Sequence, residues 1–490
     1  MPNQNKPLPP LDEIAPHILR FWKARLTDKA IVKELQKVID TDRYGIGITK
    51  LKEIRSDMGL KRAWQQGHSV ETIHDVMVDL RRIYPNAGSR EMISLLFHER
   101  DMAVPRRIMK SYFATYEPDL VRQRKARRLR RKRFWAAGVN DLFAVDQHDK
   151  WLRFGLALHT GIEPFSGRIM WMCVWHSNRN PQLILSYYLD TLTELGHMPL
   201  VTQSDLGTEN FGIANAHTLL RQWHDPALQG TLQHRWMRTK KNVMPEITWS
   251  QLRRRFTPGF ENLLDTGYGF RWVFIPWLQT ELDAYKDCVN NTAKRRDRNK
   301  VLPHGIPDII YNSPEDFGAL DFKIGIAPGA IEHIRRVMIN SSHTVFDLVP
   351  PTLGHHLASC YTHLGCPVIT RDSVWAVYLN MLNAIQLSDD LPTEIMSATE
   401  SVTDDDELPL LDNHEDLPFQ DDDSGFYYMG GVRGGRGLDV SHHAQLDTLL
   451  ADDKPDVRHA ASDAVSDDDF NGVIVWEFTD DEVDNDGDEW

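Results

Sequence analysis

The sequence has few cysteines and no long apolar run. Only four of the 490 residues are cysteine, and their spread suits a reducing compartment better than a disulfide scaffold. Because no run of about 18 apolar residues occurs, we expect no membrane span and no membrane partner. The first residues also lack the apolar core of a signal peptide, so secretion is not expected.

Basic residues are scarce in the C-terminal part of the chain. Residues 389–490 contain 31 acidic and 4 basic residues. A segment so charged and so poor in apolar residues cannot build its own core, so we expect a disordered acidic tail over 388–490. Residues 1–388 carry 52 basic and 39 acidic residues. This basic body favours a polyanionic partner, and the tail is expected to bind a basic protein or the basic body itself.

The N-terminal part, residues 17–121, has a helical pattern of apolar residues. Thr27 is a plausible N-cap, and the spacing between residues 19 and 60 outlines a helix-turn-helix. Arg106 and Arg107 would lie at the N-terminal end of a later helix, where recognition helices contact DNA. The alternative is a small helical bundle with a solvated basic face. Further helices are predicted over 70–83, 89–98 and 105–113.

A basic linker is expected over residues 122–136. Nine of the twelve residues from Arg122 to Arg133 are basic, which suits DNA phosphate or a nuclear import signal and therefore a nuclear location. A merely solvated linker is the alternative. The linker residues that we expect to contact DNA are Arg127, Arg128, Arg130 and Arg131.

The middle of the chain, residues 137–312, alternates strand and helix patterns. Strands are predicted over 142–147, 154–159, 169–175 and 200–204, and helices over 181–195 and 214–223. This β-β-β-α-β-α order predicts an α/β fold with a mixed sheet and flanking helices. Residues 313–387 are predicted to be a C-terminal extension of unknown role.

Three carboxylates stand out in this middle region. Asp146 and Asp205 follow apolar strand patterns, and Glu246 opens a basic helical segment. Oxygen ligands of this kind suit Mg²⁺, and paired ions promote phosphodiester chemistry. Each acid taken alone has a simpler interpretation. An Asp after a strand is often a turn or cap residue, and Glu246 alone would be a surface residue. Glu209 and Glu261 are fallback third acids.

Basic residues flank Glu246 and extend the predicted DNA contact. Lys240 and Lys241 precede the acid, and Arg253 and Arg254 follow it. These four side chains could contact phosphate; the alternative is a solvated surface. Asp149 and His148 lie beside the first acid, where they could support it.

Four stretches carry a family resemblance: LFAVD at 142–146, GRIMW at 167–171, SDLGTEN at 204–210 and LPHGIP at 302–307. They are similar to the integrase-core family of DDE transposases and retroviral-type integrases, closest to its eukaryotic transposon-derived branch, over roughly residues 65–312. The resemblance implies an RNase H-like fold and a site in which Asp146, Asp205 and Glu246 hold two Mg²⁺ or Mn²⁺ ions. It also implies DNA partners (element ends and target) and a homo-oligomer.

The segment around the third acid keeps Asn242, Glu246 and Trp249 but departs from the family pattern just before the Glu. Pro245 has to lie at a helix start. Two functions are therefore open beside DNA nicking and strand transfer. One is a catalytically inactive, transposon-derived DNA-binding or scaffold protein on the same fold. The other is a nuclease that cleaves without joining.

Overall fold

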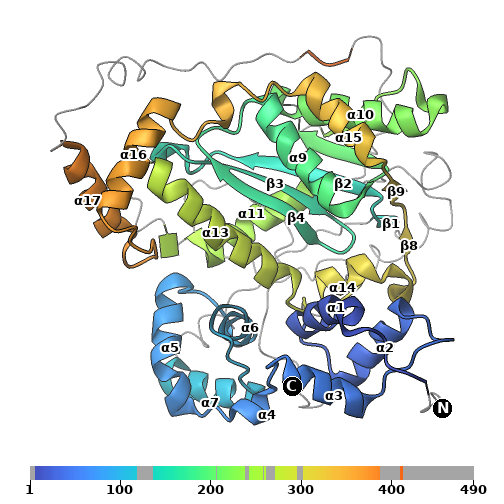
Figure 1. The fold of residues 1–490 in the computed structure, drawn as a ribbon, viewed down its shortest axis with the longest axis vertical. Helices are drawn as coiled ribbons and strands as arrows, with labels where there is room; N and C mark the ends of the chain where they lie inside the picture. The colour runs from blue at the N-terminus through green and yellow to red at the C-terminus, as the bar shows by residue number, and fades with distance from the viewer. Residues whose placement is uncertain are drawn as a thin grey trace, which may run out of the picture.

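The computed structural model describes residues 6–118, 136–205, 207–237, 242–257, 259–260, 271–294, 302–386 and 409–411. Its centre is a five-stranded mixed sheet in the order β4-β3-β2-β6-β7, with helices on both faces (Figure 1). Strands β2, β3 and β4 form an antiparallel meander, and β6 and β7 continue the sheet parallel to β2. The predicted α/β mixed sheet is confirmed. The strands are β2 (Leu142–His148), β3 (Ala157–Glu163), β4 (Arg168–Trp175), β6 (Val201–Asp205) and β7 (His234–Met237).

The side chains of β2 point alternately into two hydrophobic cores, one on each face of the sheet. Phe143 and Val145 pack in one core with α9 (Pro181–Leu195), α10 (Phe211–His224) and α15 (Pro328–Met338). Because successive side chains point to opposite faces, Leu142 and Ala144 face the other side. That side carries α11 (Val243–Arg255) and α13 (Arg271–Asn290), whose apolar residues pack with those of β3 and β4.

The N-terminal region is all helical, and its local sequence explains its boundaries. Thr27 caps α2 as predicted, since its side-chain oxygen accepts from the Ala30 N–H at 3.3 Å. Helix α5 spans the predicted residues. The first helix begins at Leu11, earlier than expected, because Ile14 and Ile18 are buried. The helices are α1 (Leu11–Lys23), α2 (Asp28–Val38), α3 (Ile48–Asp57), α4 (Ala63–Gln66), α5 (Val70–Ile83), α6 (Ser89–Arg100) and α7 (Arg106–Tyr116).

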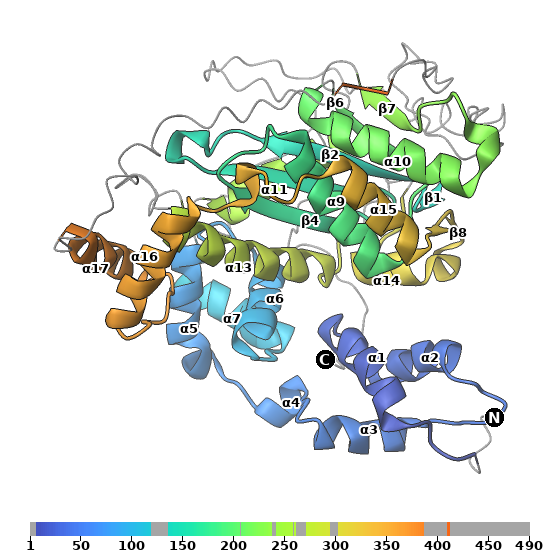
Figure 2. The same ribbon diagram turned by 45° about the horizontal axis from the view of Figure 1, so that its top comes forward.

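These helices pack against the sheet domain in two groups. The apolar residues of α1–α3 form a cluster that includes Ile309 of α14 (Pro307–Asn312). Those of α5–α7 share one continuous cluster with α11 and α13. Figure 2 shows α6 and α7 beneath α13, and α1 lower and nearer to α14.

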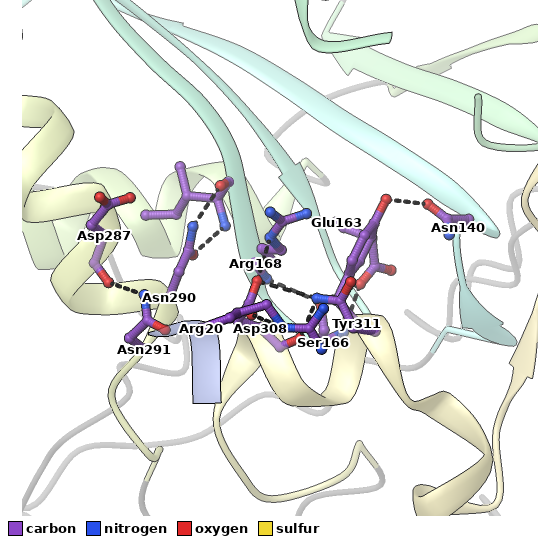
Figure 3. Close-up of polar contacts among 12 residues, drawn as sticks. Arg20, Asn140, Glu163, Ser166, Arg168, Asp287, Asn290, Asn291, Asp308 and Tyr311 are labelled. Atoms are coloured by element: carbon purple, nitrogen blue, oxygen red, sulfur yellow. Dashed lines mark hydrogen bonds and ion pairs between the residues drawn. The ribbon is translucent and has the colours of Figure 1, made fainter. Parts of the chain in front are cut away.

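A polar network reinforces the contact of α1 with the sheet domain (Figure 3). The Asp308 carboxylate lies 3.5 Å from Arg20 Nε of α1 and 3.3 Å from Arg168 Nε of β4. The Arg168 guanidinium also stacks 4.5 Å from the centre of the Tyr311 ring. Because Asp308 is buried, these cations compensate a charge that would otherwise be costly to bury.

Residues 313–386 complete the sheet domain and extend it. Two short strand pairs join them to earlier segments: β8 (Leu320–Asp321) with β1 (Gly138–Val139), and β9 (Ile324–Gly325) with β5 (His197–Met198). Helices α16 (Pro351–His363) and α17 (Val374–Gln386) pack on each other. The 3₁₀ turns are Leu152–Phe154, Thr208–Asn210, Pro226–Leu228, Pro314–Phe317 and Thr344–Phe346.

Some sequence predictions lie outside the described residues. They are the basic linker, apart from its last residue, and the acidic tail, apart from 409–411. Within the described ranges, no helix is both long and apolar enough to cross a membrane.

Candidate active site

The first two acids lie on neighbouring parallel strands. Strands β2 and β6 pair in the register Leu142 with Val201 and Ala144 with Gln203. The pairing ends at Ala144 and Gln203, so Asp146 and Asp205, each two residues further along, lie at the same end of two neighbouring parallel strands. Both lie on the face that carries α11, because side chains two residues apart share a face.

The amide of Asn242 fixes the start of α11 against both strands. Its Nδ2 donates to the Val145 carbonyl at 2.7 Å, and its Oδ1 accepts from Gln203 Nε2 at 3.2 Å. Asn242 is fully buried, so these bonds satisfy its polar atoms. Sequence reasoning missed Gln203. The sequence does hold one signal for Gln203: it lies two residues before Asp205, so both side chains point to the same face of the strand.

Glu246 lies in the first turn of α11. Pro245 is the third residue of this helix, where the backbone N–H has no partner within the helix in any case. The proline therefore agrees with the predicted helix start and does not interrupt α11. The helix N-terminus also favours the negative charge of Glu246.

Trp249, one turn after Glu246, contacts the first acid directly. Its Nε1 donates to Asp146 Oδ2 at 2.9 Å. The indole stacks on the His148 ring, with 4.9 Å between centroids and 18° between planes. Burial, with help from Lys150 and Arg253, lowers the pKa of His148 to about 4. His148 is thus a neutral platform for the indole at neutral pH.

The three acids also interact electrostatically. Burial raises the pKa of Asp146 well above its usual range, and the negative charges of Asp205 and Glu246 raise it further. Hydrogen bonds from Gln147 and Trp249 oppose this shift. Burial likewise raises the pKa of Asp205. Mutual repulsion of this kind is expected where carboxylates converge.

The donor chemistry suits a hard divalent cation. Carboxylate oxygens are the ligands that Mg²⁺ prefers, and Asp205 Oδ1 is buried with no hydrogen-bond partner among the described residues. A bound cation would compensate that oxygen and the repulsion at Asp146. In the part of the chain that the structure describes, however, no three His, Cys, Asp or Glu side chains are close enough to form a metal-binding group.

Glu209, a fallback third acid, and Asp149, a supporting residue, each have a hydrogen-bond partner of their own. Glu209 is buried and accepts a bond from Asn210 Nδ2 at 3.0 Å. Burial raises its pKa, and Asp149 and Asp205 add to the shift. Asp149 accepts from Asn178 Nδ2 at 2.8 Å. Glu209 thus interacts with Asp205, whereas Glu246 is one of the acids that act on Asp146. Glu261 lies outside the described residues.

The predicted DNA-contacting residues are only partly described. Arg106 and Arg107 open α7, directly after Pro105, and Arg107 is exposed. Arg253 is exposed on α11, close enough to His148 to lower the pKa of that ring. It therefore places a cation near His148, two residues after Asp146. The side chains of Arg127, Arg128, Arg130, Arg131, Lys240, Lys241 and Arg254 lie outside what the structure describes.

Comparison with known proteins points to the same region. A family model described as an integrase core domain matches residues 134–306. The matched range contains the five strands of the central sheet and all three acids. No curated protein matches the chain.

Proposed function

Because residues 134–306 belong to the integrase-core family, whose RNase H-like fold they adopt, we propose that this protein is a polynucleotidyl transferase that nicks DNA and joins strands. The observation that carries the proposal is that the elements of the three acids meet at one end of the sheet: Asp146 and Asp205 lie on neighbouring parallel strands, and the helix of Glu246 bonds to both strands through Asn242 and to Asp146 through Trp249.

The proposed reaction has two steps on phosphodiesters. In the first, a water oxygen attacks phosphorus and a DNA 3′ oxygen leaves, which yields a nick with a 3′-hydroxyl. In the second, that hydroxyl attacks a phosphodiester of target DNA and displaces its 3′ oxygen. Two Mg²⁺ or Mn²⁺ ions, held by the three acids, would stabilise the negative charge on the attacking and leaving oxygens.

The protein's own residues orient the acids in this proposal. Trp249 holds Asp146 through its indole N–H, and Asn242 ties the helix of Glu246 to both strands. Arg253 adds positive charge where phosphate would approach. The N-terminal helices and the basic linker would hold element ends and target DNA. A homo-oligomer, a nuclear location and a mobile-element origin belong to the same proposal.

The test is nicking and joining of supercoiled plasmid by the full chain in Mn²⁺ and Mg²⁺. We expect metal-dependent nicks that are lost in Asp205→Asn and kept in Asp57→Asn, which makes the same change at an exposed position. Joined products identify a transferase, and nicks without joining identify a nuclease.

A non-catalytic scaffold is the second candidate, favoured by the lack of a close metal-binding group among the described residues. It predicts DNA binding by the wild type and by Asp205→Asn with no nicks from either. That outcome, in both metals, contradicts the proposed chemistry.

A further inference from the structure

A short apolar segment from within the acidic region docks on the sheet domain. Pro409 O accepts a hydrogen bond from Asn215 Nδ2 at 2.9 Å, and the Leu411 N–H donates to Asn215 Oδ1 at 3.0 Å. Figure 2 shows this short segment as an isolated piece beside α10, β6 and β7. A single side-chain amide thus binds the segment through its backbone.

The two bonds match an extended peptide. Residues two apart along an extended chain point their backbone groups to the same side, so one amide can donate to the first residue and accept from the third. Pro409 loses nothing by lacking an N–H, because only its carbonyl is used. Asn215 therefore pairs with the segment as a neighbouring strand would.

Asn215 is an unusual residue for its position unless it has such a partner. It is 2% exposed, and its neighbours Ile213, Ala214 and Ala216 are fully buried. A buried amide without hydrogen bonds is costly. The docked backbone satisfies one donor and one acceptor of this amide, which explains why a polar side chain is tolerated there.

The docking site is close to the candidate active site along the chain. Asn215 is the fifth residue of α10, about 6 Å along the axis from the start of the helix. That start directly follows the turn Thr208–Asn210 after Asp205. The sequence on both sides of the docked segment is acidic: Asp404, Asp405, Asp406 and Glu407 precede it, and Asp412, Glu415 and Asp416 follow it.

We propose that Pro409–Leu411 is an intramolecular docking segment held by Asn215, and that its docking brings the acidic C-terminal sequence into competition with DNA for the basic body. The competition rests on the proposed function, because it requires that the body bind DNA. The docking itself does not. Phosphate contacts are electrostatic, so a tethered polyanion weakens DNA binding most at low salt.

Docking is tested in the full chain by hydrogen exchange at the Leu411 amide. We expect protection in the wild type and free exchange in Asn215→Ala. Free exchange in the wild type overturns the docking. This readout needs no DNA, so it decides the docking even if the proposed function fails.

Competition is tested by fluorescence anisotropy with a labelled DNA duplex of arbitrary sequence. Leu411→Pro removes the N–H that binds Asn215, whereas Leu411→Ala keeps it. The loss of one net hydrogen bond changes an equilibrium by about fivefold. We therefore expect Leu411→Pro to tighten DNA binding by about that factor relative to Leu411→Ala, and Asn215→Ala, which removes both bonds, to tighten it by at least as much. The effect should shrink as salt is raised.

The double variant separates a shared contact from unrelated effects. Leu411→Pro removes one of the two bonds that Asn215→Ala removes, so the double variant should bind DNA no more tightly than Asn215→Ala alone. A protected Leu411 amide with unchanged DNA affinity in both variants overturns the competition. So does a chain that binds no DNA in any variant, a result that also contradicts the proposed function.

Discussion

At the scale of single residues, the indole of Trp249 decides where the Asp146 carboxylate lies. Trp249→Phe keeps an aromatic ring against His148 but removes the donor to Asp146 Oδ2. Removing a partner that orients a metal ligand costs about 10- to 100-fold in activity or metal affinity. We therefore expect at least a tenfold loss of nicking and a higher Mn²⁺ concentration for half-maximal rate, measured on plasmid DNA.

The control for Trp249 is Trp64→Phe, because Trp64 is 76% exposed on α4. It should nick as the wild type does. Equal thermal unfolding midpoints for the wild type and Trp249→Phe would show that the loss is local. An unchanged Mn²⁺ requirement in Trp249→Phe would contradict the positioning role.

A buried histidine makes a separate prediction about pH and stability. Trp171 Nε1 donates to His159 Nδ1 at 3.0 Å, so that nitrogen must be unprotonated. Burial lowers the pKa of His159 from 6.5 to about 3. Between these values the unfolded chain binds a proton that the folded chain does not, so stability is present above pH 6.5 and is lost as pH falls toward 3.

The expected loss from His159 alone at pH 4.5 is about 2–3 kcal/mol. Urea unfolding of the wild type and His159→Gln at pH 7 and 4.5 measures it, because the other titrating groups cancel in the comparison. Between pH 7 and 4.5 the free energy of unfolding should fall more in the wild type than in His159→Gln. The control His355→Gln changes an exposed histidine, and it should lose about as much as the wild type. Equal losses in the wild type and His159→Gln would refute the assignment.

At the scale of secondary-structure elements, the start of α11 depends on Asn242 and tolerates Pro245. Asn242→Ala leaves the buried Val145 carbonyl and Gln203 amide without this partner. We expect it to lower the free energy of unfolding by about 2–3 kcal/mol and to reduce nicking, since Glu246 follows on the same helix.

Pro245→Ala is the matched comparison within that turn. The first-turn N–H that it restores needs no partner within the helix, so its effect on stability should stay below about 1 kcal/mol. Chemical denaturation of both variants measures the difference. A larger cost for Pro245→Ala than for Asn242→Ala would mean that the proline, and not the amide, fixes the helix start.

The elements with strong local patterns were predictable from the sequence. Helices α5 and α9 occupy the predicted residues, because periodic apolar positions and good caps define them. Strand β7 was not predicted. It has only four residues, and its place at the sheet edge depends on pairing with β6. The bridge from Asn242 to Gln203 was missed for the same reason, since it joins residues that only the fold brings together.

At the scale of the whole molecule, the N-terminal helices and the sheet domain share their cores. In the sequence they are separated by the basic linker, and they were predicted as separate regions of the chain. The contact of α1–α3 with Ile309 joins residues that are far apart in the chain, and no local pattern encodes it. DNA bound by the N-terminal helices would thus be held in a fixed relation to the sheet domain.

The ion pairs of Asp308, drawn in Figure 3, are the polar contacts between the N-terminal helices and the sheet domain. Asp308→Asn keeps the shape of the side chain but removes the charge that lies between Arg20 and Arg168. Leaving buried charges without their partner is costly; because both arginines are partly exposed, we expect a loss of about 2 kcal/mol. The loss should fall first on the attachment of α1–α3, seen as faster hydrogen exchange in α1 than in α9. Glu53→Gln, in the exposed pair with Lys50, should leave the free energy of unfolding close to that of the wild type. If exchange in α1 is unchanged in Asp308→Asn, the apolar contact with Ile309 alone holds the N-terminal helices in place.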